Sequence, residues 1–471
     1  MWWLGCIAML GEALGEDTSA PAEDPSPFSA SGEIRSSYSL LDTFPIDAQG
    51  AVNEQNAVLI PRVIGGVGMR IGDRSRVDFE AEWTHPEWMP RKARFATAQP
   101  WGKVSIGADT FGWGTGILAH DGRTSSHFGD PQHGNVVGRV SYAARPVSSL
   151  QSWMVFVAGD VVIRDENAEV FQGDLARQVV LGTRWSADDF EAGLLALVRW
   201  QRDREDSFHP SGESIESVAF PVDMYVRKTI GGELDKFQST VEAELVHVRG
   251  KTDRLWNGET GPEGGQIRSL GASTSLAVAH VPSGFTLDTE FAYASGDNDA
   301  YDNVSRTFFM HSDHKMGLIL FDQALPLISG RSVDLASDPD LIGQPPSGLR
   351  FTEAKGGLTN AVAIHPVLVW ETELPVSLRA GWLQAWSAGD WVDVYQTAKN
   401  GGYNTTAGGK APGSRELGGE LDVGVRYNPA MGSYFTLGLV AEGGVFFPGK
   451  AFEGITEDPI QTARFRAMVQ W

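Results

Sequence analysis

Two polar stretches of the chain concentrate imidazole and carboxylate groups, the side chains that bind metal ions and carry protons. The first runs from residue 116 to residue 135 and contains His120, Asp121, His127, Asp130 and His133. Imidazole and carboxylate groups together suit a transition metal. Because their spacing matches no fixed metal motif, we interpret the stretch as a polar loop, with a metal site as the alternative.

The second stretch is acidic. Asp297, Asp299 and Asp302 offer hard oxygen ligands within a short span, and calcium prefers such ligands. The sixth-position glycine and the closing glutamate of a helical calcium loop are missing. We therefore interpret the stretch as a solvated acidic loop, with calcium as the alternative, and we expect no other cofactor.

A third group, His311-Ser312-Asp313-His314, contains the residue types of a hydrolase site. Adjacent residues of a strand point to opposite faces, so a strand would separate the His311 base from the Ser312 hydroxyl. The sequence therefore predicts that the protein is not an enzyme, and a barrel-embedded hydrolase is a minor alternative.

Composition and charge exclude several classes of protein. The 471 residues carry 38 Lys and Arg against 60 Asp and Glu, a net charge of −22, so nucleic acid is not an expected partner. The single cysteine, Cys6, excludes a disulfide framework. No run of 18 apolar residues exists, which excludes a helical membrane protein. Residues 1–28 begin with an apolar run and become small and acidic, which predicts a signal peptide-like leader and a disordered tail.

Alternation of apolar and polar residues recurs along nearly the whole chain after this segment. From Val77 to Thr84, apolar and mostly acidic residues take turns, which gives a strand one apolar face and one polar face. The pattern returns at residues 236–245, 285–293, 417–427 and 462–471. We therefore interpret residues 29–471 as a single domain built mainly of strands.

The links between these strands also alternate. Short links contain the Gly, Pro, Asn and Asp that turns require, whereas long polar links include residues 43–57, 118–134, 298–357 and 389–414. A transmembrane barrel has short periplasmic turns and long extracellular loops. The sequence thus predicts an all-β fold, a large antiparallel transmembrane β-barrel of about 18 strands (16–20), in the bacterial outer membrane. The long loop 298–357 is expected to plug the barrel or to cap it.

Aromatic residues at strand ends favour this barrel over a soluble multi-sheet protein such as a lectin. Trp185 and Phe285 lie near short turns, while Trp200 and Trp382 lie near long loops, which predicts aromatic girdles at both membrane interfaces. The other face of the strands is rich in charge and glycine, which suits a water-filled lumen. Trp471 completes the alternation of the last strand. We expect the barrel assembly machinery to recognise that strand, and the barrel to contact the lipid bilayer and lipopolysaccharide.

Several stretches match a known pattern. They are residues 112–122 (GWGTGILAHDG), 294–297 (ASGD), 395–402 (YQTAKNGG), 416–422 (ELGGELD) and 446–452 (FFPGKAF). In these stretches the chain resembles a family of uncharacterised deltaproteobacterial outer-membrane proteins, and more distantly it is similar to the alginate-export type of barrel. The resemblance implies an outer-membrane pore or secretion channel. The arginine-rich conduit of the alginate exporters has no residue-by-residue counterpart here.

A barrel of this size encloses a water-filled lumen unless loops plug it. The sequence therefore predicts an outer-membrane channel, porin-like or an export pore, that passes small hydrophilic solutes or a polysaccharide. An adhesin or a purely structural barrel is the alternative. The strands that close the barrel are expected to group a basic wall of Arg35, Arg62, Arg70, Arg94, Arg464 and Arg466.

A second wall is expected to carry the acidic residues Glu242, Glu244, Asp288 and Glu290. Inward charges and inward loops set the selectivity of a pore, so these walls and the loop of residues 116–135 are the candidate pore-lining and constriction residues. The alternative for each charge is an ion pair with a neighbour that only hydrates the wall.

Overall fold

The computed structural model describes residues 26–471 except residues 55, 85, 125, 133, 148–149, 151, 206–213, 232–235, 254–264, 300–301, 344, 347 and 432–433. Most of the predicted leader, and the candidate residue His133, thus lie outside the described residues. Across the described residues, no helix is long and apolar enough to cross a membrane.

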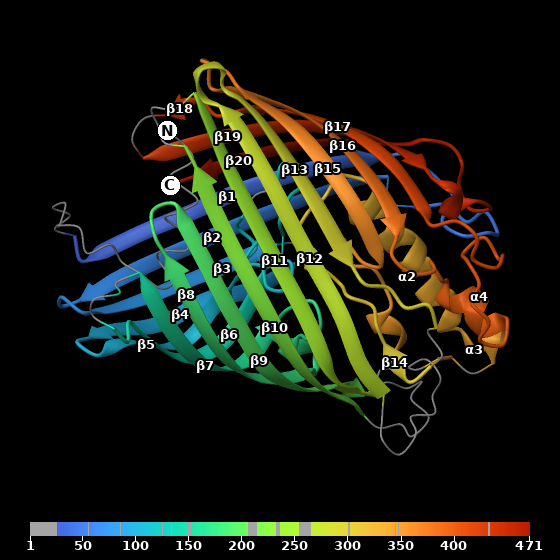
Figure 1. Ribbon diagram of the computed structural model, residues 1–471, viewed down its shortest axis with the longest axis horizontal. Coiled ribbons are helices and arrows are strands. Elements are labelled where there is room, and N and C mark those ends of the chain that lie inside the picture. Colours follow the sequence, from blue (N-terminus) through green and yellow to red (C-terminus); the bar gives the residue numbers. More distant parts are fainter. Residues whose placement is uncertain are drawn as a thin grey trace.

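The described residues form one closed antiparallel β-barrel of 18 long strands (Figure 1). The barrel closes where β1 pairs with β20, from Glu33 opposite Gln470 to Leu41 opposite Thr462. The long strands are β1 (Phe28–Leu41), β2 (Ala57–Ile71), β3 (Ser75–Thr84), β4 (Glu87–Gln99), β5 (Gly102–Phe111), β6 (Asn135–Ala144), β7 (Trp153–Arg164), β8 (Leu175–Ser186), β9 (Phe190–Glu205), β10 (Ser214–Ile230), β11 (Phe237–Thr252), β12 (Gly265–His280), β13 (Phe285–Ala294), β15 (Ala361–Glu371), β16 (Val376–Ser387), β17 (Glu416–Tyr427), β19 (Phe435–Pro448) and β20 (Ile460–Gln470). The predicted barrel is confirmed.

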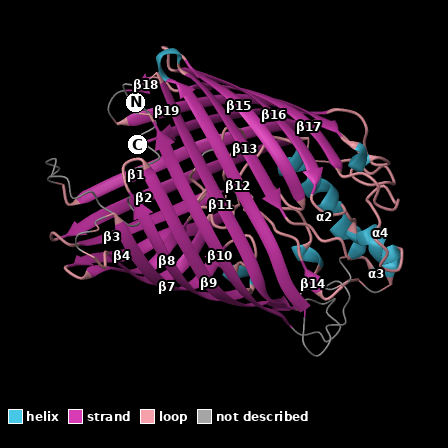
Figure 2. Ribbon diagram, in the orientation of Figure 1, coloured by secondary structure: helices cyan, strands magenta, loops and turns pink. Residues whose placement is uncertain are grey.

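The connections alternate between the two ends of the barrel, as the sequence predicts. Short turns lie at the end of the barrel where β1 begins and β20 ends (Figure 1). In one of them, Gly72 has a φ of 61°, a left-handed conformation that favours glycine. The long connections lie at the other end, together with the α-helices (Figure 2). The short elements within connections are β14 (Val304–Ser305), β18 (Ala430–Met431), α2 (Leu325–Ala336), α3 (Pro339–Ile342), α4 (Val394–Lys399), the π-helical turn Leu320–Ala324 and the 3₁₀ turns Val170–Gln172, Val281–Ser283, Leu349–Phe351 and Lys450–Phe452.

The outer surface of the barrel is apolar and the inner surface is charged. In β3, Phe79 is 51% exposed whereas the adjacent Glu80 is 6% exposed, which is the reverse of a soluble protein. The predicted girdle residues Trp185, Phe285, Trp200 and Trp382 are exposed on this surface. Other exposed aromatic residues at strand ends are Phe237, Tyr427, Phe435 and Trp471 near short turns and Trp386 near a long loop. The barrel and this surface together are those of a bacterial outer-membrane protein, as predicted.

One part of the inner surface is apolar, which the prediction of a charged and glycine-rich lumen missed. Ala363, Leu383 and Phe446 project inward from β15, β16 and β19 and pack against Phe308 and Leu318 of the long connection. Residues 295–360 therefore fold partly into the barrel and cover this wall, while α2 and α3 lie at its mouth (Figure 1).

Candidate functional site

Two segments of the chain lie inside the barrel and join distant strands. We call residues 112–134, between β5 and β6, the constriction loop. We call residues 306–324, within the long connection between β13 and β15, the plug segment. Side chains of both segments contact β13 on one side and β20 on the other. The candidate functional site is therefore the set of charged wall residues that holds these two segments in the lumen.

The basic wall consists of β1, β2 and β20, which lie side by side. Arg35 is opposite Arg62 across β1 and β2, and Ser37 is opposite Arg466 across β1 and β20. Asp130 of the constriction loop neutralises this wall, because its carboxylate accepts hydrogen bonds from Arg35 and, at 2.7 Å, from Arg466. The Asp130 and Arg466 side chains are 4% and 9% exposed, so this contact is a buried anchor rather than a solvated ion pair.

Arg464 holds the plug segment in the same way. Its guanidinium donates to Asp322 at 2.8 Å, and Lys315 of the plug segment donates to the same carboxylate. Burial opposes the charged form, but Lys315 and Arg464 lower the pKa of Asp322 below its usual value. The Asp322 carboxylate therefore stays ionised in neutral solution.

The acidic wall consists of β11 and β13, and it holds histidines and backbone amides of the same two segments. Asp288 contacts His127 of the constriction loop at 2.8 Å. Glu290 accepts a hydrogen bond from His314 of the plug segment at 2.7 Å. Glu244 accepts from the Thr115 hydroxyl at 2.7 Å and from the backbone N–H groups of Thr115 and Gly116.

His314 is positively charged in this arrangement. Its Nε2 faces Glu290 and its Nδ1 lies 3.0 Å from the carbonyl oxygen of Thr115. Both partners accept hydrogen bonds, so both ring nitrogens must carry protons. Burial opposes this charge, but Glu290 and the Thr115 carbonyl raise the pKa of His314 to about 9.

A further carboxylate, Glu420 of β17, fixes the start of the π-helical turn. Its two oxygens accept hydrogen bonds from the backbone N–H groups of Leu318 (2.5 Å), Ile319 (2.8 Å) and Leu320 (2.8 Å). The first N–H groups of a helix lack partners within the helix, and a buried carboxylate satisfies them. Sequence reasoning missed Glu420, although it is a charge on a strand whose flanking residues are glycine and leucine.

The other predicted wall residues have local roles. Arg62 forms a bidentate pair with Glu82 at 2.8 and 2.9 Å, and Arg94 bridges Asp109 (2.8 Å) and Asp78 (2.9 Å). Glu242 pairs with Arg227 at 3.1 Å. Arg70 is exposed at the short-turn end of β2. The geometry of Arg62, Arg94 and Glu242 therefore fits the alternative interpretation, in which each charge forms an ion pair with a neighbour on the wall.

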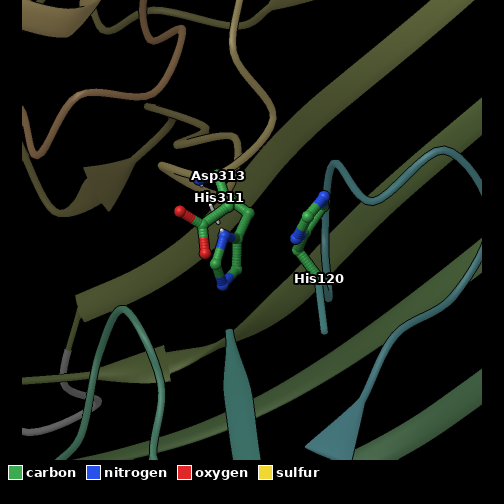
Figure 3. Close-up of side chains that lie close together, drawn as sticks. All are labelled: His120, His311 and Asp313. Carbon is green, nitrogen blue, oxygen red and sulfur yellow. Dashed lines mark hydrogen bonds between the residues drawn. The ribbon is translucent and has the colours of Figure 1, made fainter. Parts of the chain in front are cut away.

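The constriction loop and the plug segment meet at a buried cluster of His120, His311 and Asp313 (Figure 3). The possible ligand atoms of these side chains lie within 4.8 Å of one another. Gly122 N–H donates to His120 Nδ1 at 2.9 Å, and Asp313 N–H donates to His311 Nδ1 at 3.1 Å. These nitrogens are therefore acceptors, and each neutral ring carries its proton on Nε2.

Hydrogen bonds already occupy most of this cluster. His311 Nε2 contacts Asn135 Oδ1 at 2.8 Å, and the Asp313 carboxylate accepts from the backbone N–H groups of Gln132 and Gly134, both at 2.6 Å. A metal would have to displace a backbone donor from each imidazole it bound through Nδ1. Burial lowers the pKa of His120 to about 4, which keeps its ring neutral. The cluster thus joins the two segments by hydrogen bonds.

The described candidates within residues 116–135 do not assemble a metal site. His127 and Asp130 bind different walls, and of the described candidates only His120 reaches the His–Asp cluster. Asp121 instead accepts from Arg123 N–H at 2.9 Å within the loop. The prediction grouped these side chains by closeness in sequence, whereas the barrel separates them.

The considered calcium and hydrolase sites also have other partners. Arg306 donates to Asp297 (3.1 Å) and Asp302 (2.7 Å), so a guanidinium supplies the positive charge there. Asp299 donates its N–H to Asp297 at 3.1 Å. The Ser312 hydroxyl donates to Glu166 at 2.5 Å, and His311 is not its hydrogen-bond partner. This geometry does not favour a hydrolase.

No protein-family model and no curated protein matches the sequence. The fold is similar to solved porins: a BenF-like porin from Pseudomonas fluorescens (TM-score 0.54, 9% identity, covering 94% of this chain and 98% of that one), OccK2 of Pseudomonas aeruginosa in complex with glucuronate (0.52, 9%, 94% and 95%) and OccAB1 of Acinetobacter baumannii (0.52, 9%, 94% and 96%). The resemblance to an outer-membrane barrel is supported, but neither the deltaproteobacterial family nor the alginate-export type is supported by these comparisons. By fold, the chain is a closed outer-membrane β-barrel similar to these porins.

Proposed function

We propose that the protein is an outer-membrane channel that passes small hydrophilic solutes, with the constriction loop and the plug segment as its filter. The observation that carries the proposal is the double anchoring of both segments, to β20 through Asp130 and Asp322 and to β13 through His127 and His314. Charged, inward-folded loops set size and charge limits in channels. The solved porins of the same fold, one of them with bound glucuronate, support this function.

Two segments fixed across the lumen do not favour export of a polysaccharide, because a polymer needs a continuous wide conduit. An adhesin would need neither anchored inward segments nor buried charges to hold them. Contact with lipopolysaccharide and recognition of the last strand by the assembly machinery remain predictions.

The test is single-channel recording of the refolded protein in a planar lipid bilayer. We expect steady conductance. The reversal potential in a salt gradient then shows whether the filter selects cations or anions. A deletion of residues 314–322 that leaves the barrel folded should increase conductance. Protein that inserts as a folded barrel, yet stays closed both with and without this segment, would contradict the proposal.

A further inference from the structure

A cavity of about 370 Å³ lies between the inner face of β8–β12 and the long connection. Its size falls within the range of small-molecule sites, about 300–1,000 Å³. Leu118 of the constriction loop and Phe308 of the plug segment line it, so the cavity lies beside the filter on the side of the long loops. A solute that enters from outside would meet the cavity before the filter.

The charges in the cavity wall exclude an anionic ligand. Arg199 is the one cationic residue among the described lining residues, against the carboxylates of Asp165, Asp297 and Asp390. Its guanidinium is already bonded to Asp165 and donates Nε–H to Gln201 at 2.8 Å. Asp297 and Asp390 are likewise paired, with Arg306 and Arg415. A bound anion would therefore find no free cation in the described wall and would lose its hydration without gaining a counter-charge.

Amide groups with unused hydrogen-bonding atoms point to a hydroxylated ligand. Within the described chain, Asn135 Nδ2 and Gln178 Oε1 have no hydrogen-bond partner, although Asn135 Oδ1 contacts His311 and Gln178 Nε2 donates to Asp160. Neither atom is among the buried unpaired atoms, so both remain accessible in the cavity. Asn135 Nδ2 offers donors and Gln178 Oε1 offers an acceptor, and a hydroxyl group can bond to both because it accepts and donates.

Aromatic rings complete the wall on the side of the long connections. Phe309, Phe351 and Trp391 line the cavity, and Trp391 is held in place by Phe452 at a ring distance of 4.7 Å. Rigid rings offer flat apolar surface at a small entropic cost. The C–H face of a sugar ring fits such a surface, while its hydroxyl groups reach the amides.

We propose that this cavity is a binding site for a neutral hexose-type polyol, taken up from the outside ahead of the filter. The proposal rests on the proposed channel function and narrows it to a substrate class. It separates this chain from a site built for sugar acids. Glucuronate carries a carboxylate in place of the CH2OH group of glucose, and the described cavity wall has no free cation to pair with that carboxylate.

The experiment compares glucose with glucuronate by isothermal titration calorimetry on the folded, detergent-solubilised barrel, and by interruptions of the ion current in a bilayer. We expect glucose to bind in the millimolar range and glucuronate to bind at least about tenfold more weakly. Equal or tighter binding of glucuronate would overturn the proposal. Calorimetry measures binding without ion flow. A barrel that binds glucose but never conducts would therefore contradict the proposed channel function and leave the binding site supported.

Variants of neighbouring residues on β10 locate the site. Ala219 lines the cavity, whereas Phe220 is exposed on the outer face. Ala219→Trp should fill the cavity and weaken glucose binding by about tenfold or more, and Phe220→Trp should leave it unchanged. If the Ala219→Trp variant does not fold, Ala219→Leu replaces it in the test. Wild-type affinity in a folded Ala219 variant would place the binding elsewhere and refute the assignment.

Discussion

The basic wall and the acidic wall hold the same two segments with different chemistry. At the basic wall, Arg466 and Arg464 bind the carboxylates of Asp130 and Asp322, and arginine keeps its charge at any pH the protein meets. At the acidic wall, Asp288 and Glu290 bind His127 and His314, and His314, with a pKa raised to about 9, loses its charge only in alkaline solution. The comparison teaches that acid, which neutralises Asp322, releases the basic wall, whereas alkali, which neutralises His314, releases the acidic wall.

The largest effect is expected from removing a carboxylate at the basic wall. Asp130→Ala removes the buried carboxylate that Arg35 and Arg466 share and leaves them only Glu33 (3.2 Å) and Glu442 (3.5 Å) as counter-charges. Breaking such a buried pair costs about 3–5 kcal/mol. The constriction loop should detach, which should raise the mean conductance and the current noise and expose the loop to trypsin.

Asp121→Ala is the matched control, because Asp121 lies in the same loop and its side-chain carboxylate accepts the N–H groups of Arg123 and Thr124 within that loop. Its loss should cost about 1 kcal/mol and leave the conductance near that of the wild type. Equal conductance in the two variants would mean that the basic wall does not position the loop.

A smaller effect is expected at β17, between the two walls. Glu420→Gln keeps the shape of the side chain but removes the charge that accepts three backbone N–H groups of the plug segment. Hydrogen bonds to a charged group contribute about 1.5–3 kcal/mol. Hydrogen exchange at Leu318–Leu320 should become faster, whereas Glu416→Gln, an exposed change on the same strand, should leave it unaltered.

The acidic wall should respond to alkaline pH. The folded protein raises the pKa of His314 from 6.5 to about 9. The stabilisation from the contact of His314 with Glu290 is therefore fully present below about pH 6.5 and is lost as the pH rises through 9. Conductance or plug mobility should increase across that interval. The pKa of Asp322 is lowered instead, so the Arg464 contact should fail only in acid, below the usual carboxylate range.

His314→Gln tests the assignment of this alkaline step. The variant lacks the titrating group, so its conductance should not change between pH 7 and pH 10, while the wild type changes near pH 9. A step of the same size in both proteins would assign the response to another group.

Most strands of the barrel can be predicted from local sequence, because the alternation of apolar and polar side chains along a strand does not depend on which strand lies beside it. Alternation and turn residues locate the 18 strands, and closure of the first strand on the last places Arg35 and Arg62 next to Arg464 and Arg466. These groupings depend only on strand order and register.

The filter itself depends on contacts between segments far apart in the chain, which local pattern does not encode. His120 meets His311 and Asp313 only because two connections fold into one lumen. A signal for the plug segment is present in β15, where Ala361, Val362, Ala363 and Ile364 are all apolar. A strand that is apolar on both faces is covered on both faces, and such a run in a barrel indicates a wall buried beneath an inward loop.

The smallest effect is expected where an ion pair lies outside both walls. Lys410 and Glu453 pair at 2.7 Å at the mouth of the barrel, with side chains 58% and 61% exposed. An exposed pair contributes about 0–1 kcal/mol and is screened by salt. Lys410→Ala should therefore leave the conductance and its alkaline step unchanged at low and high salt. A change comparable to that of Asp130→Ala would show that the mouth, rather than the buried anchors of the two walls, limits passage through the barrel.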